Sequence, residues 1–209
     1  MLIRCGYDIR FETENRTAMM AMLSLHPSRH HDLRTPQRLM ADPDIPLYHF
    51  EDGFGNVATR LTIPAGGVTL SCDFVIEDSG DPDISAPDGA QMPVEELPDA
   101  VMPFLLGSRY CETDRLMAVA WANFAHYSTA RTRVDAIVDF VHNHIEFGYH
   151  HARSDKTAWN AYQERQGVCR DFAHLAVTLC RCMNIPARYC TGYLGDIGIP
   201  PVDAPMDFS

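Results

Sequence analysis

The sequence has no apolar run that approaches the roughly 18 residues of a membrane-spanning helix. Residues 1–7 also lack the apolar stretch of a signal peptide. Lysine is nearly absent, because Lys156 is its single occurrence, and the arginines form neither a basic stripe nor a basic amphipathic helix. We therefore expect a cytoplasmic protein that binds neither membranes nor nucleic acid.

The seven cysteines give an odd count without the regular spacing of a disulfide framework, which indicates a reducing compartment. No Cys-x-x-Cys pair is present, so a thioredoxin-like redox role is excluded. His142 with His144 and Cys180 with Cys182 contain metal-ligand types, but residues two apart on a helix point about 200° apart. The sequence therefore predicts neither a metal site nor a cofactor.

The net charge of −11 comes largely from one segment. Eight acidic residues lie at positions 77–99, where no Lys or Arg occurs, and 20 acidic against 17 basic residues remain elsewhere. Asp, Gly, Pro and Ser are frequent in the same segment, which is typical of loose connections. We assign residues 78–99 to an acidic linker between two domains.

Residues 1–77 have the period-2 alternation of half-buried strands. Apolar and polar residues alternate at 3–11, 57–63 and 68–76, residues 52–56 carry a turn signal, and 18–25 predicts a further strand. These strands predict a small antiparallel sheet or β-sandwich as the N-terminal domain.

Residues 100–209 change to a helical period, and we assign them to a second domain. Thr132 with Asp135 predicts a capping box for the second helix, and residues 187–194 are interpreted as a strand after the last helix. Helices followed by a strand indicate an α+β fold class. Two stripes define the first helices: Leu116, Val119, Ala120, Phe124 and Tyr127, then Val134, Ile137, Val138, Val141 and Ile145.

A lone thiol, Cys169, lies where a loop becomes a third helix. The apolar series Phe172, Leu175, Ala176, Leu179, Cys180 and Met183 follows one helical stripe. Gly167 frees the backbone before this helix, and Asp171 suits its positive end. Unpaired N–H groups in such a first turn can lower a cysteine pKa from about 8.5 to between roughly 3.5 and 7.5 when a cationic partner helps, and they can hold an oxyanion. Spacing alone leaves a nucleophile and a small buried residue equally open.

The stretch Gly167 to Leu175, together with residues 179–181, 184–189 and 191–194, closely resembles the core of bacterial transglutaminase-like proteins, which are described as cysteine proteases. The likeness extends back through 108–111 and 147–149 to the N-terminal strands. It implies a papain-like core with a Cys-His-Asp triad, in which Cys169 matches the nucleophile, and a peptide or protein substrate.

In that family the histidine and aspartate follow the cysteine, whereas the last histidine here is His174. Five residues turn a helix through roughly 500°, so His174 is predicted to point away from Cys169, on the helix surface or in a second layer. None of the other histidines has a context that selects it as a base. Ser209 stands at or beside the family histidine. Either the chain is a fragment cut before its remaining strands, which we favour, or serine replaces that histidine.

The resemblance predicts cysteine-dependent acyl transfer or amide hydrolysis through a thioacyl intermediate at Cys169. Hydrolysis and transamidation share this intermediate, and the sequence does not separate them. Because the family base is not present, we expect this chain alone to be inactive. The alternative is a non-catalytic module that binds a peptide or protein on the same fold. Oligomeric state is not predicted.

Overall fold

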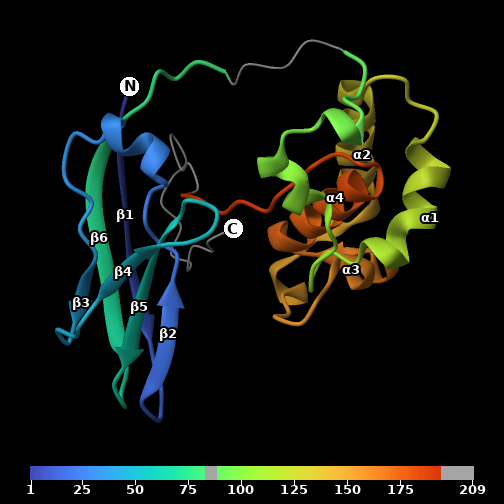
Figure 1. Ribbon diagram of the computed structural model, residues 1–209. Helices are drawn as coiled ribbons and strands as arrows, with labels where there is room; N and C mark the ends of the chain where they lie inside the picture. The colour runs from blue at the N-terminus through green and yellow to red at the C-terminus, as the bar shows by residue number, and fades with distance from the viewer. Residues whose placement is uncertain (83–88, 194–209) are drawn as a thin grey trace. The chain divides into compact units, whose positions relative to one another are not determined.

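The structure is a computed structural model that describes residues 1–82 and 89–193. The chain divides into two compact units, Met1–Asp83 and Ile84–Ser209. Antiparallel sheets form the first unit and helices dominate the second (Figure 1), so the α+β class expected from the sequence is confirmed.

Two three-stranded antiparallel sheets make up the first unit. Their strand orders are β1-β6-β3 and β2-β5-β4. The strands are β1 (Leu2–Phe11), β2 (Thr17–Ala21), β3 (Met40–Asp42), β4 (Tyr48–Glu51), β5 (Val57–Ile63) and β6 (Val68–Glu77), with a 3-10 helix at Pro27–Asp32.

The core of this unit follows the alternation read from the sequence. Every second residue of β6, from Val68 to Ile76, is buried, while β1 pairs with β6 along its whole length. Leu61 and Ile63 of β5 pack into the same cluster as Val68. The strand predicted at 18–25 is shorter than expected and ends at Ala21. The strands β3 and β4 are too short to show a period, which is why the sequence did not predict them.

The second unit contains four α-helices and short connecting elements among its described residues. The helices are α1 (Thr113–Phe124), α2 (Ala130–His144), α3 (Ala158–Glu164) and α4 (Cys169–Cys182). Two short strands, β7 (Glu146–Phe147) and β8 (Gln166–Gly167), pair in parallel, and 3-10 helices lie at Val94–Glu96, Asp99–Leu105 and Tyr149–His151.

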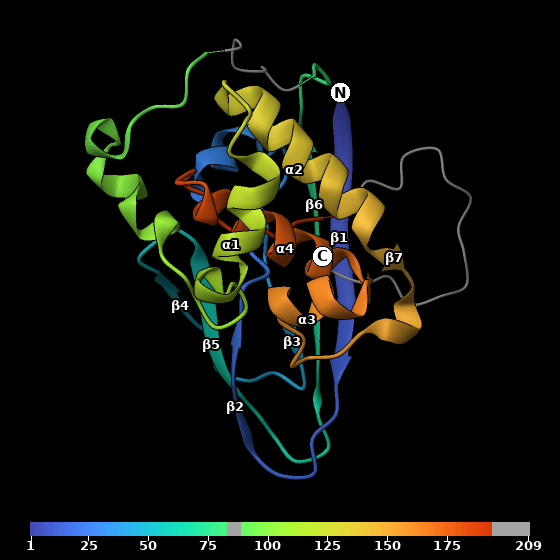
Figure 2. The same cartoon turned by 90° about the vertical axis from the view of Figure 1, so that its right-hand side faces the viewer.

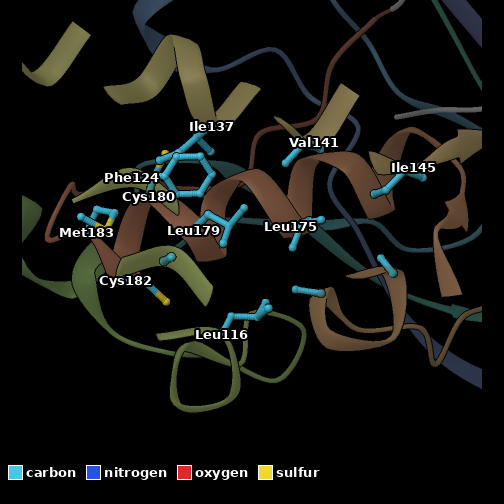
Figure 3. Close-up of a cluster of buried hydrophobic side chains, with 13 residues drawn as sticks. Leu116, Phe124, Ile137, Val141, Ile145, Leu175, Leu179, Cys180, Cys182 and Met183 are labelled. Carbon is cyan, nitrogen blue, oxygen red and sulfur yellow. The ribbon is translucent and has the colours of Figure 1, made fainter. Parts of the chain in front are cut away.

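Helix α4 is the centre of this unit, since α1, α2 and α3 all contact it (Figure 2). Ile137 and Val141 from α2 lie on one side of α4, and Leu116 from α1 lies on the other (Figure 3). Leu175 and Leu179 of α4 are completely buried between them. The element that begins at Cys169 is therefore held by the main core of the unit.

Two predictions for this unit are wrong in detail, and one helix was not predicted. Thr132 does not begin α2, because the N-cap is Thr129, whose hydroxyl accepts the Thr132 N–H at 3.2 Å. Helix α3 was not predicted, since seven residues give too short a pattern. Residues 187–193 form no strand, and Leu194 lies outside the described residues. Ala187 donates its N–H to the Phe104 carbonyl, and its own carbonyl accepts from Arg181 Nε, so these groups are bonded without a neighbouring strand.

Within the described ranges no helix is long and apolar enough to cross a membrane. The same ranges hold no group of three His, Cys, Asp or Glu side chains that could bind a metal ion.

Candidate active site

The first turn of α4 places Cys169 at the first helical residue, as the sequence predicted. Asp171, which is fully buried, accepts the Val168 N–H on its Oδ2 atom at 2.9 Å. A carboxylate that accepts the N-cap N–H pairs a backbone donor that has no partner within the helix, and its negative charge is stabilised by the positive end of the helix dipole. This bond fixes where the helix begins, and therefore where the thiol lies.

Gly167 has a different role from the one expected. Its φ does not lie in the left-handed region, so backbone freedom is not what glycine provides here. A Cβ on Gly167 would lie 2.7 Å from Asp171 Oδ2 and 2.8 Å from Asp171 Cβ. Glycine is required because the capping carboxylate occupies the space of a side chain.

The amide groups of this turn also differ from the expectation that they are unpaired. The N–H groups of Asp171 and Phe172 both donate to the Val168 carbonyl oxygen, at 2.8 and 3.3 Å. They are therefore engaged inside the turn, and an oxyanion near Cys169 would be stabilised by the helix dipole rather than by these two donors.

The segment before Cys169 is held by two further elements. Parallel pairing of β7 with β8 places Phe147 opposite Gly167, and the Gly148 N–H donates to the Gly167 carbonyl at 3.0 Å. The buried ammonium of Lys156 donates to the Gln166 carbonyl at 2.9 Å. The end of α2 and the start of α4 are thereby brought together.

A cavity of about 720 Å³ lies where these helices meet, and Cys169 is on its wall. Helix α4 contributes Cys169, Phe172, Ala173 and Ala176, which share one face at the spacing i, i+3, i+4, i+7. Cys169 is half-buried. The thiol is thus at an opening of the molecule and not within its core, which favours the nucleophile over a small buried residue.

The opposite wall comes mainly from α2 and includes a histidine that the sequence did not single out. Val138, Val141, His142 and Ile145 line the cavity with the same helical spacing, and Phe147 of β7 completes it. The sequence signal that could have found His142 is its spacing, because it lies four residues after Val138 and therefore on the same face of α2. His142 is thus the histidine that shares this cavity with Cys169 among the described residues.

His174 does not lie on the helix surface; it is in the second layer, with 6% of its surface exposed. Its ring stacks on Tyr110, with centroids 5.2 Å apart and planes 2° apart, and contacts Tyr189 at 4.9 Å. Burial, reinforced by the positive charge of Arg170, lowers the pKa of His174. A neutral imidazole between two tyrosines packs the helix and is a poor general base for Cys169.

The neighbours of Cys169 include Tyr189, the phenol next to His174. Burial raises the pKa of Tyr189, and an electrostatic interaction with Cys169 adds to the effect. Three buried polar atoms in the first turns of α4 have no hydrogen-bond partner within the described ranges: Arg170 Nε, Asp171 Oδ1 and His174 Nδ1. The surroundings of the thiol are polar on this side and apolar on the side of the cavity.

Most of the other thiols are poor competitors for a reagent in water. Burial raises the pKa of both Cys180 and Cys182 to about 11. Burial also raises the pKa values of Cys5 and Cys72, and Cys111 is buried. Cys190 is the exception, because its residue is exposed. Any test of thiol selectivity at Cys169 must therefore control for Cys190.

Comparisons with known proteins agree with this arrangement. Residues 120–204 match the profile of the transglutaminase-like superfamily, a range that contains α2, α3 and α4. The uncharacterized protein ML0607 of Mycobacterium leprae is 26% identical over 160 residues, which are 75% of this chain and 57% of that protein. The chain thus spans a little over half of that relative.

A solved structure shows the same fold. It is described as a putative cysteine protease from Cytophaga hutchinsonii, and it superposes with a TM-score of 0.81 at 27% sequence identity. The match covers 96% of this chain and 72% of the other. The family profile over residues 120–204 and the structural likeness together support an assignment to the transglutaminase-like superfamily.

Proposed function

We propose that Cys169 is the nucleophile of a cysteine-dependent enzyme that transfers an acyl group or hydrolyses an amide or peptide bond. The observation that carries this proposal is the position of the thiol, at the first residue of a helix that the core holds in place and on the wall of a cavity. The superfamily and the solved relative described as a cysteine protease support the same chemistry.

The reaction has two steps. The sulfur attacks the carbonyl carbon of the substrate, an S–C bond forms, the C–N bond breaks, and the proton of the thiol ends on the departing amine. Water or a second amine then attacks the thioester, takes the acyl group and returns a proton to the sulfur. The positive end of the α4 dipole stabilises negative charge at the sulfur and at the adjacent oxyanion.

An activated ester tests the thiol directly, because its leaving group needs no protonation by a base. The protein is mixed with p-nitrophenyl acetate, and the acylated residue is located by peptide mass spectrometry. We expect acetylation at Cys169, its loss in Cys169→Ala, and no change at Cys169 in the matched control Cys190→Ser, which removes the exposed thiol. Equal acetylation of Cys169 and Cys190, or none at Cys169, would refute the nucleophile.

The cavity also favours a second candidate, a binding module that holds a peptide or protein segment without reacting with it. A module of this kind would keep its affinity for such a segment in Cys169→Ala and would not form a thioester with the activated ester. The acetylation experiment therefore separates the two functions.

A further inference from the structure

Strand β1 forms a long open edge of the first unit. In the sheet order β1-β6-β3, β6 pairs with one side of β1, and no described residue pairs with its other side. This edge runs for ten residues, from Leu2 to Phe11, whereas the edge strands β2, β3 and β4 have five, three and four residues. It also contains no proline, a residue that natural proteins place on edges to block further pairing. Its unpaired N–H and C=O groups are therefore a template for another strand.

The apolar side of β1 is only partly covered. On β6, every second residue from Val68 to Ile76 is buried, and each of them lies opposite an odd-numbered residue of β1. β6 has a neighbouring strand on both sides for part of its length, whereas β1 has a neighbour on one side only. A further strand beside β1 would therefore remove more of its apolar row from water. The residues of this row are all half-buried: Ile3, Cys5, Tyr7, Ile9 and Phe11.

The exposed side of β1 carries charges of both signs in a symmetric order. Arg4 and Asp8 stand two residues before and two residues after Gly6. When a second copy of β1 lies antiparallel to the first with Gly6 opposite Gly6, Arg4 of each copy faces Asp8 of the other. Facing residues of an antiparallel pair lie on the same side of the sheet, so the half-buried apolar rows of the two copies also meet.

Charge selects this register among those that keep the apolar rows together. A shift of two residues in one direction would place Arg4 opposite Arg10 of the other copy, and like charges directly opposite are destabilising. A shift of two residues in the other direction would place Asp8 opposite Leu2 and Arg4 opposite Gly6, so that neither charge would have a partner. The pairing centred on Gly6 gives both charges a partner of opposite sign.

Both charged groups are available for this contact. Asp8 is exposed and has no ion pair among the described residues. Arg4 contacts Asp73 of β6 at 2.7 Å, with 78% of its side chain exposed. Its guanidinium has five N–H donors, of which Asp73 accepts two, so donors remain for a second carboxylate.

We propose that two copies of this chain associate through β1, as an antiparallel pair related by a two-fold axis at Gly6. A second copy is the occupant of the open edge because the strand is complementary to itself in charge and in its apolar row. Such an isologous contact is closed, since each copy uses its β1 edge once. The pairing therefore yields a dimer and not a fibre, and it is independent of the chemistry at Cys169.

Sedimentation equilibrium measures the association. Protein concentrations from about 1 μM to about 1 mM cover weak and moderate complexes, and we expect a monomer–dimer equilibrium in this range. A reducing agent keeps the exposed Cys190 from forming a disulfide between copies. Hydrogen exchange with mass spectrometry locates the contact, because amides of residues 2–11 should be better protected at high than at low concentration. A monomer at every concentration, or protection that changes only outside β1, would overturn the proposal.

Exchange of charges between the copies tests the register. Asp8→Arg places arginine opposite Arg4 at both ends of the pair, and Arg4→Asp places aspartate opposite Asp8. We expect each variant alone to have a dissociation constant at least about tenfold higher than the unaltered chain. An equimolar mixture of the two variants should associate again, because every facing pair then joins an arginine to an aspartate.

Asp44→Arg is the matched control for these variants. It makes the same change of charge at an exposed residue that lies outside every strand, and it should leave the dissociation constant unchanged. Association of Asp8→Arg as strong as that of Asp44→Arg would overturn the proposed pair. A mixture that associates no better than either variant alone would overturn it as well.

Discussion

Replacement of Gly167 by alanine tests whether the capping carboxylate determines the position of Cys169. The added Cβ would lie 2.7 Å from Asp171 Oδ2 and 3.1 Å from its Cγ, and Asp171 is fully buried. Either the carboxylate moves and the buried Val168 N–H loses its partner, or the turn distorts to keep the bond.

The expected cost follows from these two possibilities. An unpaired buried donor costs about 1 to 3 kcal/mol, and a lost N-cap interaction about 0.5 to 2 kcal/mol. Overpacking in a closed site costs about 1 to 3 kcal/mol. We therefore expect Gly167→Ala to lower the free energy of unfolding of the helical unit by about 2 to 4 kcal/mol.

Tryptophan fluorescence during urea unfolding is the suitable assay, because both tryptophans of the chain, Trp121 and Trp159, lie in the helical unit. Gly192→Ala is the matched control, since a Cβ at Gly192 meets nothing within 4 Å. We also expect Gly167→Ala to slow acetylation of Cys169 at least about tenfold, because small displacements of a reacting group are costly. A stability within about 0.5 kcal/mol of Gly192→Ala would refute this account of the cap.

Three further predictions concern groups that support the site. Lys156→Met should lower the free energy of unfolding by about 2 to 3 kcal/mol, because Lys156 is buried and pairs with the partly exposed Glu164 at 3.1 Å. Burial raises the pKa of Glu164, but Lys156 and Arg153 outweigh this effect, so the pKa is lowered. The loss of stability in Lys156→Met should therefore be largest above the ordinary glutamate pKa and shrink as urea titrations move to lower pH. A loss that does not change with pH would contradict the role of this ion pair. Burial lowers the pKa of His174, so as pH falls His174 is protonated in the unfolded chain before it is protonated in the folded one. The free energy of unfolding should therefore decrease as pH drops below about 6.5. His174→Phe should flatten this pH dependence, and an unchanged slope would show that another group causes the decrease. Cys180 and Cys182, with pKa values of about 11, should react with iodoacetamide at pH 7 only as fast as the protein unfolds, and labelling at the rate of a small thiol would show that they are open to solvent.

The candidate site was predicted only in part. The sequence predicted the helix that begins at Cys169 and the place of Asp171 in its first turn, because both depend on residues within one or two turns. It did not predict that the Asp171 carboxylate accepts the Val168 N–H. It did not select His142, whose place on the cavity wall depends on how α2 packs against α4. The sequence also allowed a surface position for His174. A helical pattern gives the direction of a side chain around the helix axis, but it does not show that Tyr110 and Tyr189 cover the histidine ring.

What the sequence by itself determined are the features set by local periodicity. These are the strands of the first unit that alternate every second residue, the amphipathic helices, and the position of the thiol at a helix start. The tertiary structure alone decided that Gly167 must leave room for a carboxylate, that residues 187–193 form no strand while Ala187 bonds to Phe104 and Arg181, and that two helix faces line a cavity beside Cys169. The cavity and the Ala187–Phe104 bond depend on contacts between residues far apart in the chain, and hydrophobic periodicity carries no information about which distant surfaces meet. The role of Gly167 depends on where the Asp171 side chain lies, which periodicity does not give either.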